Sequence, residues 1–175
     1  MAKQYKILFT FLIINCAVLI GQTNLVPNPS FEIHDTCPTT ADQMSRAMYW
    51  SSYCESPDYF NSCAPVGGMS VPYNPVGYQK AVYGNAYAGF VTWQTKQAAP
   101  NYREIIGAPL TTTLTIGTKY YFSFFVSNAG TQNYTVGSNN VGVRFSTVSY
   151  SKSDTAPVNN IANYHTSIRI LSSGR

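Results

Sequence analysis

Apolar and polar residues alternate with a period of two over short stretches of this chain, and Gly, Pro and Asn separate these stretches. The clearest example is Lys119–Ser127 (KYYFSFFVS), where Tyr120, Phe122, Phe124 and Val126 fall on one face. A period of two predicts a strand with one face in the core and the other face partly covered.

Shorter stretches of the same kind recur along the chain, and helical patterning is scarce. We expect further strands at Ala86–Trp93, Tyr102–Ile106, Leu110–Ile116, Val141–Tyr150 and Thr166–Leu171. Asp42–Met48 is the one candidate for a helical turn or two, with Thr40 as its cap. Regular short strands with Gly, Pro and Asn turns predict an all-β fold, an antiparallel sandwich or barrel, in a single domain.

The stretch Ser56–Phe90 combines turn-forming residues with aromatic ones. Pro65, Pro72 and Pro75 exclude a helix, because each removes a backbone donor and clashes with the preceding turn. Tyr and Phe are too frequent for a disordered tail. We therefore expect ordered, tyrosine-rich loops, which is typical of the ligand surfaces of extracellular binding modules.

The beginning of the chain has the pattern of an export signal. Lys3 and Lys6 precede the apolar run Ile7–Ile20, which is shorter than the roughly 20 residues of a membrane span. We predict a signal peptide over residues 1–22 and a secreted or cell-surface domain over residues 23–175, with no membrane span after signal removal. An uncleaved anchor or a lipoprotein modified at Cys16 is the alternative.

Charge argues against one class of partner. After removal of the leader, nine Lys and Arg remain against seven Asp and Glu, so the net charge is about +2. The remaining basic residues form no cluster, and the electrostatic footprint of a nucleic-acid-binding protein is therefore absent.

Three cysteines remain after the leader, in an oxidising compartment where disulfides persist. They allow one bridge. We predict Cys37–Cys63, closing a loop over the tyrosine-rich segment, and Cys54–Cys63 is the alternative. A metal site is not expected, because the cysteines lack paired C-x-x-C spacing and His34 and His165 are far apart in sequence.

Flat aromatic rings with polar groups at the rim are what sugar binding requires. For each aromatic ring, packing in the core or in a loop is the alternative to ligand binding. For Arg103 the alternative is a structural salt bridge. Asp58 is favoured as a turn-capping residue. The candidate ligand-binding residues are Tyr59, Tyr73, Asn74, Tyr78, Tyr83 and Arg103.

A longer set of motifs resembles a known family. The set comprises NLVPNPSFE from Asn24, Cys37-Pro38, Trp50, SPDYFNSC, VPYNPVGYQ, GNAYAGF, YREIIGAPL and GTKYYF. It is similar to the N-terminal galactose-binding-like domain of exported surface proteins from Bacteroidetes-type bacteria. Those proteins often continue into an outer-membrane peptidoglycan-binding domain or a type IX sorting domain.

The resemblance implies a jelly-roll sandwich and several details. Cys37 and Cys63 match the family's cysteine pair, whereas Cys54 is extra. Glu32, at the end of the first strand, matches an acidic residue that helps to hold a structural Ca²⁺ in related carbohydrate-binding modules; a solvated carboxylate without any cofactor is the alternative. A complete domain of this kind would continue past Leu171, so the resemblance implies that the last strands are missing.

These patterns favour a non-catalytic module that binds a glycan or another cell-surface component. A structural or adhesive envelope domain acting through protein–protein contacts is the second hypothesis, and a fragment of a glycan-cleaving enzyme is the third. We do not expect an enzyme, because the chain has no nucleophile, metalloprotease or phosphate-loop motif and no evident carboxylate pair. The sequence leaves the oligomeric state open.

Overall fold

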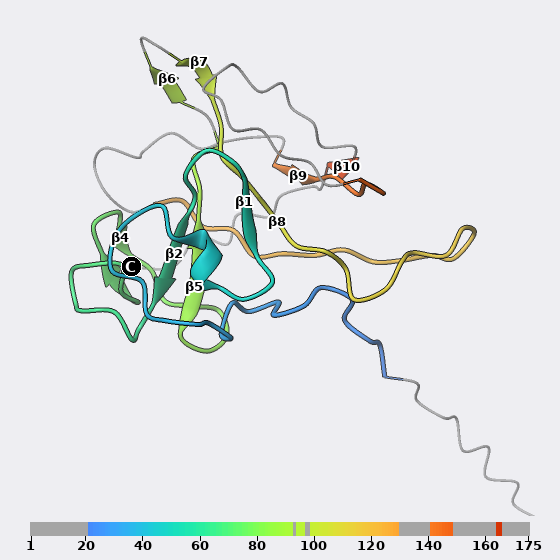
Figure 1. The fold of residues 1–175 in the computed structure, drawn as a ribbon, viewed down its shortest axis with the longest axis horizontal. Helices are drawn as coiled ribbons and strands as arrows, with labels where there is room; N and C mark the ends of the chain where they lie inside the picture. Colours follow the sequence, from blue (N-terminus) through green and yellow to red (C-terminus); the bar gives the residue numbers. More distant parts are fainter. Residues whose placement is uncertain (1–20, 93, 97–98, 130–140, 149–163, 166–175) are drawn as a thin grey trace, which may run out of the picture.

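The computed structural model describes residues 21–92, 94–96, 99–129, 141–148 and 164–165, and within them the chain is all-β with one short 3-10 helix (Figure 1). Every strand pairing is antiparallel and joins two strands. The elements, in chain order, are η1 (Met44–Arg46), β1 (Ser51–Cys54), β2 (Asp58–Asn61), β3 (Tyr73–Asn74), β4 (Gly77–Tyr78), β5 (Ala86–Gly89), β6 (Gln94–Lys96), β7 (Ala99–Tyr102), β8 (Ile105–Gly107), β9 (Gly142–Val143) and β10 (Tyr164–His165).

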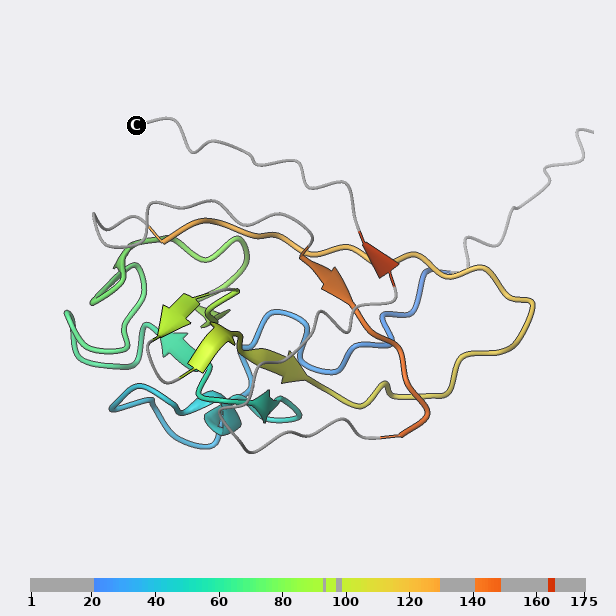
Figure 2. The same cartoon turned by 90° about the horizontal axis from the view of Figure 1, so that it is seen from above.

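The pairings confirm the antiparallel all-β prediction in its coarse form. β1 pairs with β8, β2 with β5, β3 with β4, β6 with β7, and β9 with β10. Among the described residues these ladders stay separate two-stranded units rather than joining into the two large sheets of a sandwich. The β2–β5 and β1–β8 ladders lie near the centre, whereas β6–β7 projects away from it and long irregular connections surround the strands (Figure 1 and Figure 2).

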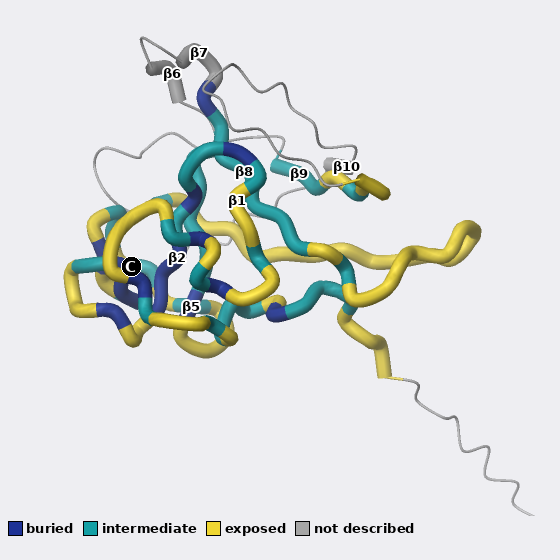
Figure 3. Tube along the Cα trace, viewed as in Figure 1, coloured by how far each residue is buried: buried dark blue, intermediate teal, exposed yellow. Residues whose placement is uncertain are grey.

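Strand β2 organises the interior because both of its faces are covered. Tyr59 belongs to one buried cluster with Met44 and Ala47, and Phe60, the next residue along, belongs to a second cluster with Met69. Adjacent residues of a strand point to opposite faces, so β2 lies between the two clusters. Figure 3 shows the buried part of the tube concentrated around β2 and β5.

The N-terminal segment is fixed to this centre through Asn28. The Asn28 side chain donates to the carbonyl oxygens of Ile33 (2.8 Å) and Met48 (3.0 Å) and accepts from the Ile33 N–H (3.0 Å). The indole N–H of Trp50 donates to the Asn28 carbonyl at 2.9 Å. Asn28 adopts a left-handed backbone conformation (φ 45°), which Asn tolerates better than most residues.

The helical prediction is confirmed as a single 3-10 turn, but its predicted cap is wrong. The Thr40 hydroxyl donates to the Ala41 carbonyl, at the adjoining residue, and Gln43 is the residue that precedes the turn. The Gln43 side-chain oxygen accepts from the backbone N–H of Thr39 at 2.8 Å, and so closes the loop before the turn.

Lys119–Ser127, the clearest strand prediction, belongs to none of the strands described. Its aromatic rings contact other aromatic rings: Phe122 lies 5.5 Å from Phe124 and 5.8 Å from Phe145 between ring centroids. In Figure 2 the orange part of the connection that contains this segment runs along the upper side of the view, apart from the central strands. The period of two predicts that side chains alternate between two faces, but it does not show whether another strand lies beside the segment to pair with it.

The other strand predictions divide in the same way. β5 confirms the first half of the predicted strand Ala86–Trp93. β8 covers only the end of the predicted strand Tyr102–Ile106. Leu110–Ile116 belongs to none of the strands described. Residues 1–20 of the predicted leader (1–22), the end of Val141–Tyr150 and all of Thr166–Leu171 lie outside the described residues. Within the described part, none of the helices has the length and apolar character needed to cross a membrane.

Candidate functional site

The turn between β3 and β4 presents two of the predicted tyrosines side by side. Tyr73 and Tyr78 are directly opposite each other in this antiparallel pair, and 57% and 59% of their surfaces are exposed. Side chains of residues paired in this way emerge on the same face of the ladder. The two rings therefore form a small exposed aromatic face on a short hairpin.

Asn74 holds this hairpin in place from below. Its side-chain amide donates to the Ser70 carbonyl (3.0 Å) and to the Tyr87 hydroxyl (2.6 Å), and its side-chain oxygen accepts from the Val76 N–H (3.1 Å). Asn74 is buried, so its predicted place at the rim of a ligand site is wrong. It positions the hairpin, because a buried amide with every group paired has nothing to offer a ligand.

Tyr59 also departs from its predicted place. It is 0% exposed and lies in the core, where its hydroxyl donates to the Phe31 carbonyl at 2.8 Å and accepts from the Asn61 side-chain amide at 2.7 Å. Tyr59 is predicted to lie on a ligand surface, but it is a core residue. Nothing in the SPDYFNSC motif could show that both faces of this strand are covered.

Tyr83 is exposed (67%) and contacts a residue far away in the sequence. Its ring lies 6.0 Å from that of Phe125, edge to face, and the Ser127 hydroxyl donates to the Gln79 side-chain oxygen at 2.6 Å. Two contacts thus connect the segment around residues 125–127 to the loops that follow β4. Local sequence patterns could not reveal this neighbourhood, because Ser127 and Gln79 are 48 positions apart and Phe125 and Tyr83 are 42 apart (125 − 83).

An open hollow of about 290 Å³ lies at the base of the hairpin. Pro72 and Lys80 flank the hairpin in sequence and line the hollow, and Lys80 carries its one charged side chain. The lining residues are Ser62, Val71, Pro72, Lys80, Ala81, Gly84 and Asn85. Hydroxyl, amide and ammonium groups beside apolar Val and Pro suit a polar ligand with an apolar face. Arg103 is half-buried and is not part of this lining.

Glu32 reaches the same loop from the N-terminal segment. Its carboxylate accepts a hydrogen bond from the Asn85 N–H at 2.8 Å and lies against Gly84. This contact gives Glu32 a structural role without an ion. Among the described residues, no two other His, Cys, Asp or Glu side chains bring ligand atoms together with its carboxylate. Calcium at Glu32 stays a prediction of the resemblance.

A second carboxylate, Glu104, is held in a half-buried hydrogen-bond network. It accepts from the Val91 N–H (2.7 Å), the Tyr102 hydroxyl (2.9 Å) and the Ser56 hydroxyl (3.3 Å). Burial raises the pKa of Glu104, and burial also raises the pKa of Tyr102 to about 12. Three donors on one carboxylate describe a structural anchor that ties β7 to the preceding loops.

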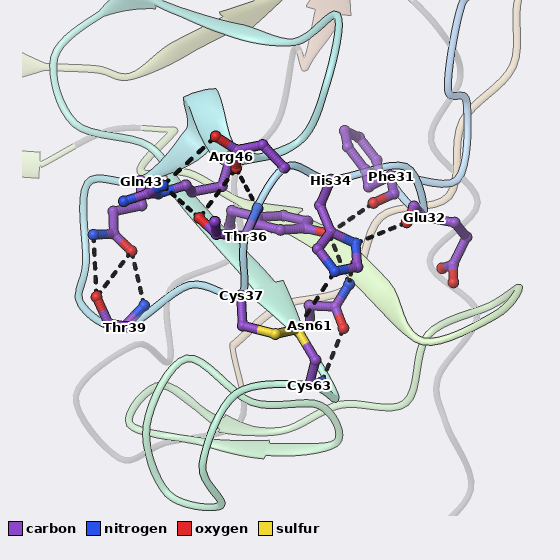
Figure 4. The surroundings of a disulfide bond; sticks show 12 residues. Phe31, Glu32, His34, Thr36, Cys37, Thr39, Gln43, Arg46, Asn61 and Cys63 are labelled. Atoms are coloured by element: carbon purple, nitrogen blue, oxygen red, sulfur yellow. Dashed lines mark hydrogen bonds and ion pairs between the residues drawn. A yellow bond between two sulfur atoms is a disulfide. The ribbon is translucent and has the colours of Figure 1, made fainter.

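The Cys37–Cys63 pairing is confirmed, with Cα atoms 5.6 Å apart, and Cys54 is buried in β1 outside this bridge. Figure 4 shows His34 directed toward the bridge, and its Nε2 lies 3.7 Å from the Cys63 sulfur. On sequence grounds His34 is weighed only against His165, which is far away in the sequence, so its contact with Cys63 is missed. The signal available in the sequence was the spacing His34-x-x-Cys37, which places an imidazole near a cysteine locally.

The chain has no match among known protein families, characterised proteins or solved structures. The contacts described above therefore carry the functional argument.

Proposed function

We propose that this chain is a secreted or cell-surface binding module without catalytic activity, and that it recognises carbohydrate, such as a cell-envelope glycan, at the β3–β4 hairpin. The observation that carries the proposal is the exposed pair Tyr73 and Tyr78, set directly opposite each other on a hairpin that Pro72 and Lys80, two residues lining the open hollow, flank in sequence. Aromatic rings stack on the apolar faces of sugars, and Lys80 and Asn85 supply hydrogen-bond donors nearby.

The hairpin is held in a single conformation, and this supports a binding role. Asn74 fixes the turn by three hydrogen bonds, so little conformational entropy is lost when a ligand orders the two rings further. The motif resemblance to galactose-binding-like jelly rolls of exported bacterial surface proteins points to the same class of ligand. We propose the jelly-roll sandwich as the finer fold on this resemblance alone.

The test is binding of the purified protein to a glycan array, with and without Ca²⁺, by wild type and by a Tyr73→Ala/Tyr78→Ala double variant. We expect selective binding by wild type and at least a tenfold loss in the double variant. The matched control is Tyr121→Ala, which removes a tyrosine that is 83% exposed outside the hairpin and should leave glycan binding unchanged. Equal binding by the double variant would reject the proposed site.

A structural or adhesive role through protein contacts is the second candidate, and one observation favours it. Tyr121 and Phe125 expose large rings on a segment that belongs to none of the described strands. Exposed apolar surface of this kind marks interaction sites. If no glycan binds to folded, monomeric protein, cross-linking at this segment on intact cells becomes the next test, with Tyr121→Ala as the variant expected to reduce it.

A further inference from the structure

Three metal-binding side chains meet at the disulfide. The ligand atoms of His34, Cys37 and Cys63 all lie within 4.8 Å of one another, and among the described residues no other three His, Cys, Asp or Glu side chains come together in this way. His34 Nε2 is 3.7 Å from the Cys63 sulfur. Zn–S bonds of about 2.3 Å and Zn–N bonds of about 2.0 Å at tetrahedral angles place ligand atoms roughly 3.5–3.8 Å apart. The observed separation already matches one edge of such a site.

The orientation of the imidazole fits the same purpose. His34 Nδ1 lies 2.9 Å from the Glu32 carbonyl oxygen, so Nδ1 carries the hydrogen and donates it there. The other ring nitrogen, Nε2, then presents its lone pair to the sulfur atoms. A backbone carbonyl that accepts from the far nitrogen is the usual outer-shell support of a metal-binding histidine.

Contacts independent of the disulfide hold two of these residues, His34 and Cys63, in place. The Asn61 side-chain oxygen accepts from the Cys63 N–H at 2.9 Å, and its amide donates to the buried Tyr59 hydroxyl at 2.7 Å. His34 forms a β-bridge with Ala47, in the centre of the first core cluster. These contacts do not depend on the disulfide, so we expect His34 and Cys63 to stay near one another after reduction (Figure 4). Cys37 follows His34 by three residues, which keeps its thiol within reach.

We propose that His34, Cys37 and Cys63 form a zinc site that is present only when the disulfide is reduced. A dithiol reductant reduces the bridge by thiol–disulfide exchange: the S–S bond receives two electrons and two protons to give two thiols, and the dithiol becomes a disulfide. Zn²⁺ then displaces the two thiol protons and accepts the Nε2 lone pair. Because Cys63 is exposed, solvent water completes the fourth position.

The chemistry of the three ligands selects the ion. Two thiolates and one imidazole are soft or borderline donors, which suit Zn²⁺, whereas Ca²⁺ and Mg²⁺ require oxygen ligands. The bridge and the metal use the same two sulfur atoms, so each excludes the other. Oxidation therefore releases the ion, and metal binding protects the thiols from oxidation.

The test uses the full chain with Cys16→Ala and Cys54→Ala, so that Cys37 and Cys63 are the only thiols. The protein is reduced with an excess of dithiol, transferred without oxygen into buffer free of reductant, and titrated with Zn²⁺ against a chromophoric chelator and with Co²⁺ by visible absorption. We expect one ion per chain, the intense visible bands of tetrahedral cobalt thiolate, and no binding by the oxidised protein.

His34→Ala decides between this site and a bare cysteine pair. We expect its zinc affinity to fall by at least about tenfold, while His165→Ala, which changes the other histidine, leaves the affinity unchanged. Circular dichroism of the reduced, metal-free variants and titration in denaturant show whether folding is needed. Equal affinity of wild type and His34→Ala, equal affinity of the folded and denatured chains, or failure to bind Zn²⁺ would each overturn the proposal.

Discussion

The Glu32 carboxylate occupies the space that a side chain at Gly84 would need, because a Cβ at Gly84 would overlap the Glu32 Cδ atom. Gly84 also has a left-handed backbone conformation (φ +67°), and the next residue, Asn85, donates its N–H to the same carboxylate. One contact thus joins the N-terminal segment to the loop beside the proposed binding face.

This relationship predicts a larger cost for Gly84→Ala than for Gly67→Ala. Both glycines have positive φ, so both substitutions strain the backbone by about 1 kcal/mol. A Cβ at Gly67 meets nothing within 4 Å, whereas one at Gly84 displaces Glu32. We expect Gly84→Ala to lower the free energy of unfolding by roughly 1 kcal/mol more, because the hydrogen bond to Asn85 is lost.

Urea denaturation measures both variants, and a double-mutant cycle identifies the cause. In a Glu32→Ala background the extra cost of Gly84→Ala should disappear, since the clash and the hydrogen bond are already gone. An extra cost that persists would assign the effect to the backbone alone. The same proteins with and without Ca²⁺ test the role of the carboxylate as an ion ligand.

Asn28 should be among the most sensitive positions of the N-terminal segment. Asn28→Ala removes three side-chain hydrogen bonds, to Ile33 and Met48, and we expect a loss of roughly 3 kcal/mol in the free energy of unfolding. Asn28→Asp keeps the acceptor for the Ile33 N–H, but it places a buried carboxylate oxygen against the carbonyl oxygens of Ile33 and Met48, so its loss should be at least as large. A chemical denaturation series of the two variants at neutral pH checks the order, and a clearly smaller loss for Asn28→Asp would contradict the donor–acceptor assignment.

The part of this molecule that the sequence predicts is the part governed by local chemistry. The antiparallel strands and the short turn near Asp42 follow from alternation and turn residues. The cysteine spacing left Cys37–Cys63 and Cys54–Cys63 both open, and the motif resemblance favoured the pair that the structure contains. The fate of Tyr59 and of Lys119–Ser127 depends on which distant segments cover them, and a period of two carries no information on that. The same holds for His34: its spacing from Cys37 is visible in the sequence, but its position beside Cys63 depends on the fold.

The disulfide should supply a substantial share of the stability. Cys37 and Cys63 are 26 residues apart, and loop closure over this length stabilises the folded state by roughly 3 kcal/mol in the chain-entropy account. We expect a Cys37→Ser/Cys63→Ser double variant to lose that amount relative to the oxidised wild type, measured by thermal and urea denaturation. A reductant should lower the stability of wild type and leave the double variant unchanged; a matching response of both would assign the effect to Cys54.

Glu104 predicts an unusual direction of pH dependence. Burial raises the pKa of this carboxyl in the folded state, so the folded protein holds the proton more tightly than the unfolded chain does. Its contribution to stability is therefore fully present below the ordinary glutamate pKa and is lost as the pH rises through the raised value.

The free energy of unfolding of wild type, minus that of Glu104→Gln, should increase as the pH falls from about 7.5 to about 4.5. Burial raises the pKa of Asp58 as well, and because Asp58 is present in both proteins its own burial cancels in the difference. The charge of Asp58 also helps to raise the pKa of Glu104, and this coupling acts in the same direction as the burial of Glu104. Urea denaturation at a series of pH values measures this difference, and one that decreases toward acid would show that the hydrogen bonds from Val91 and Tyr102 to the carboxylate outweigh its burial.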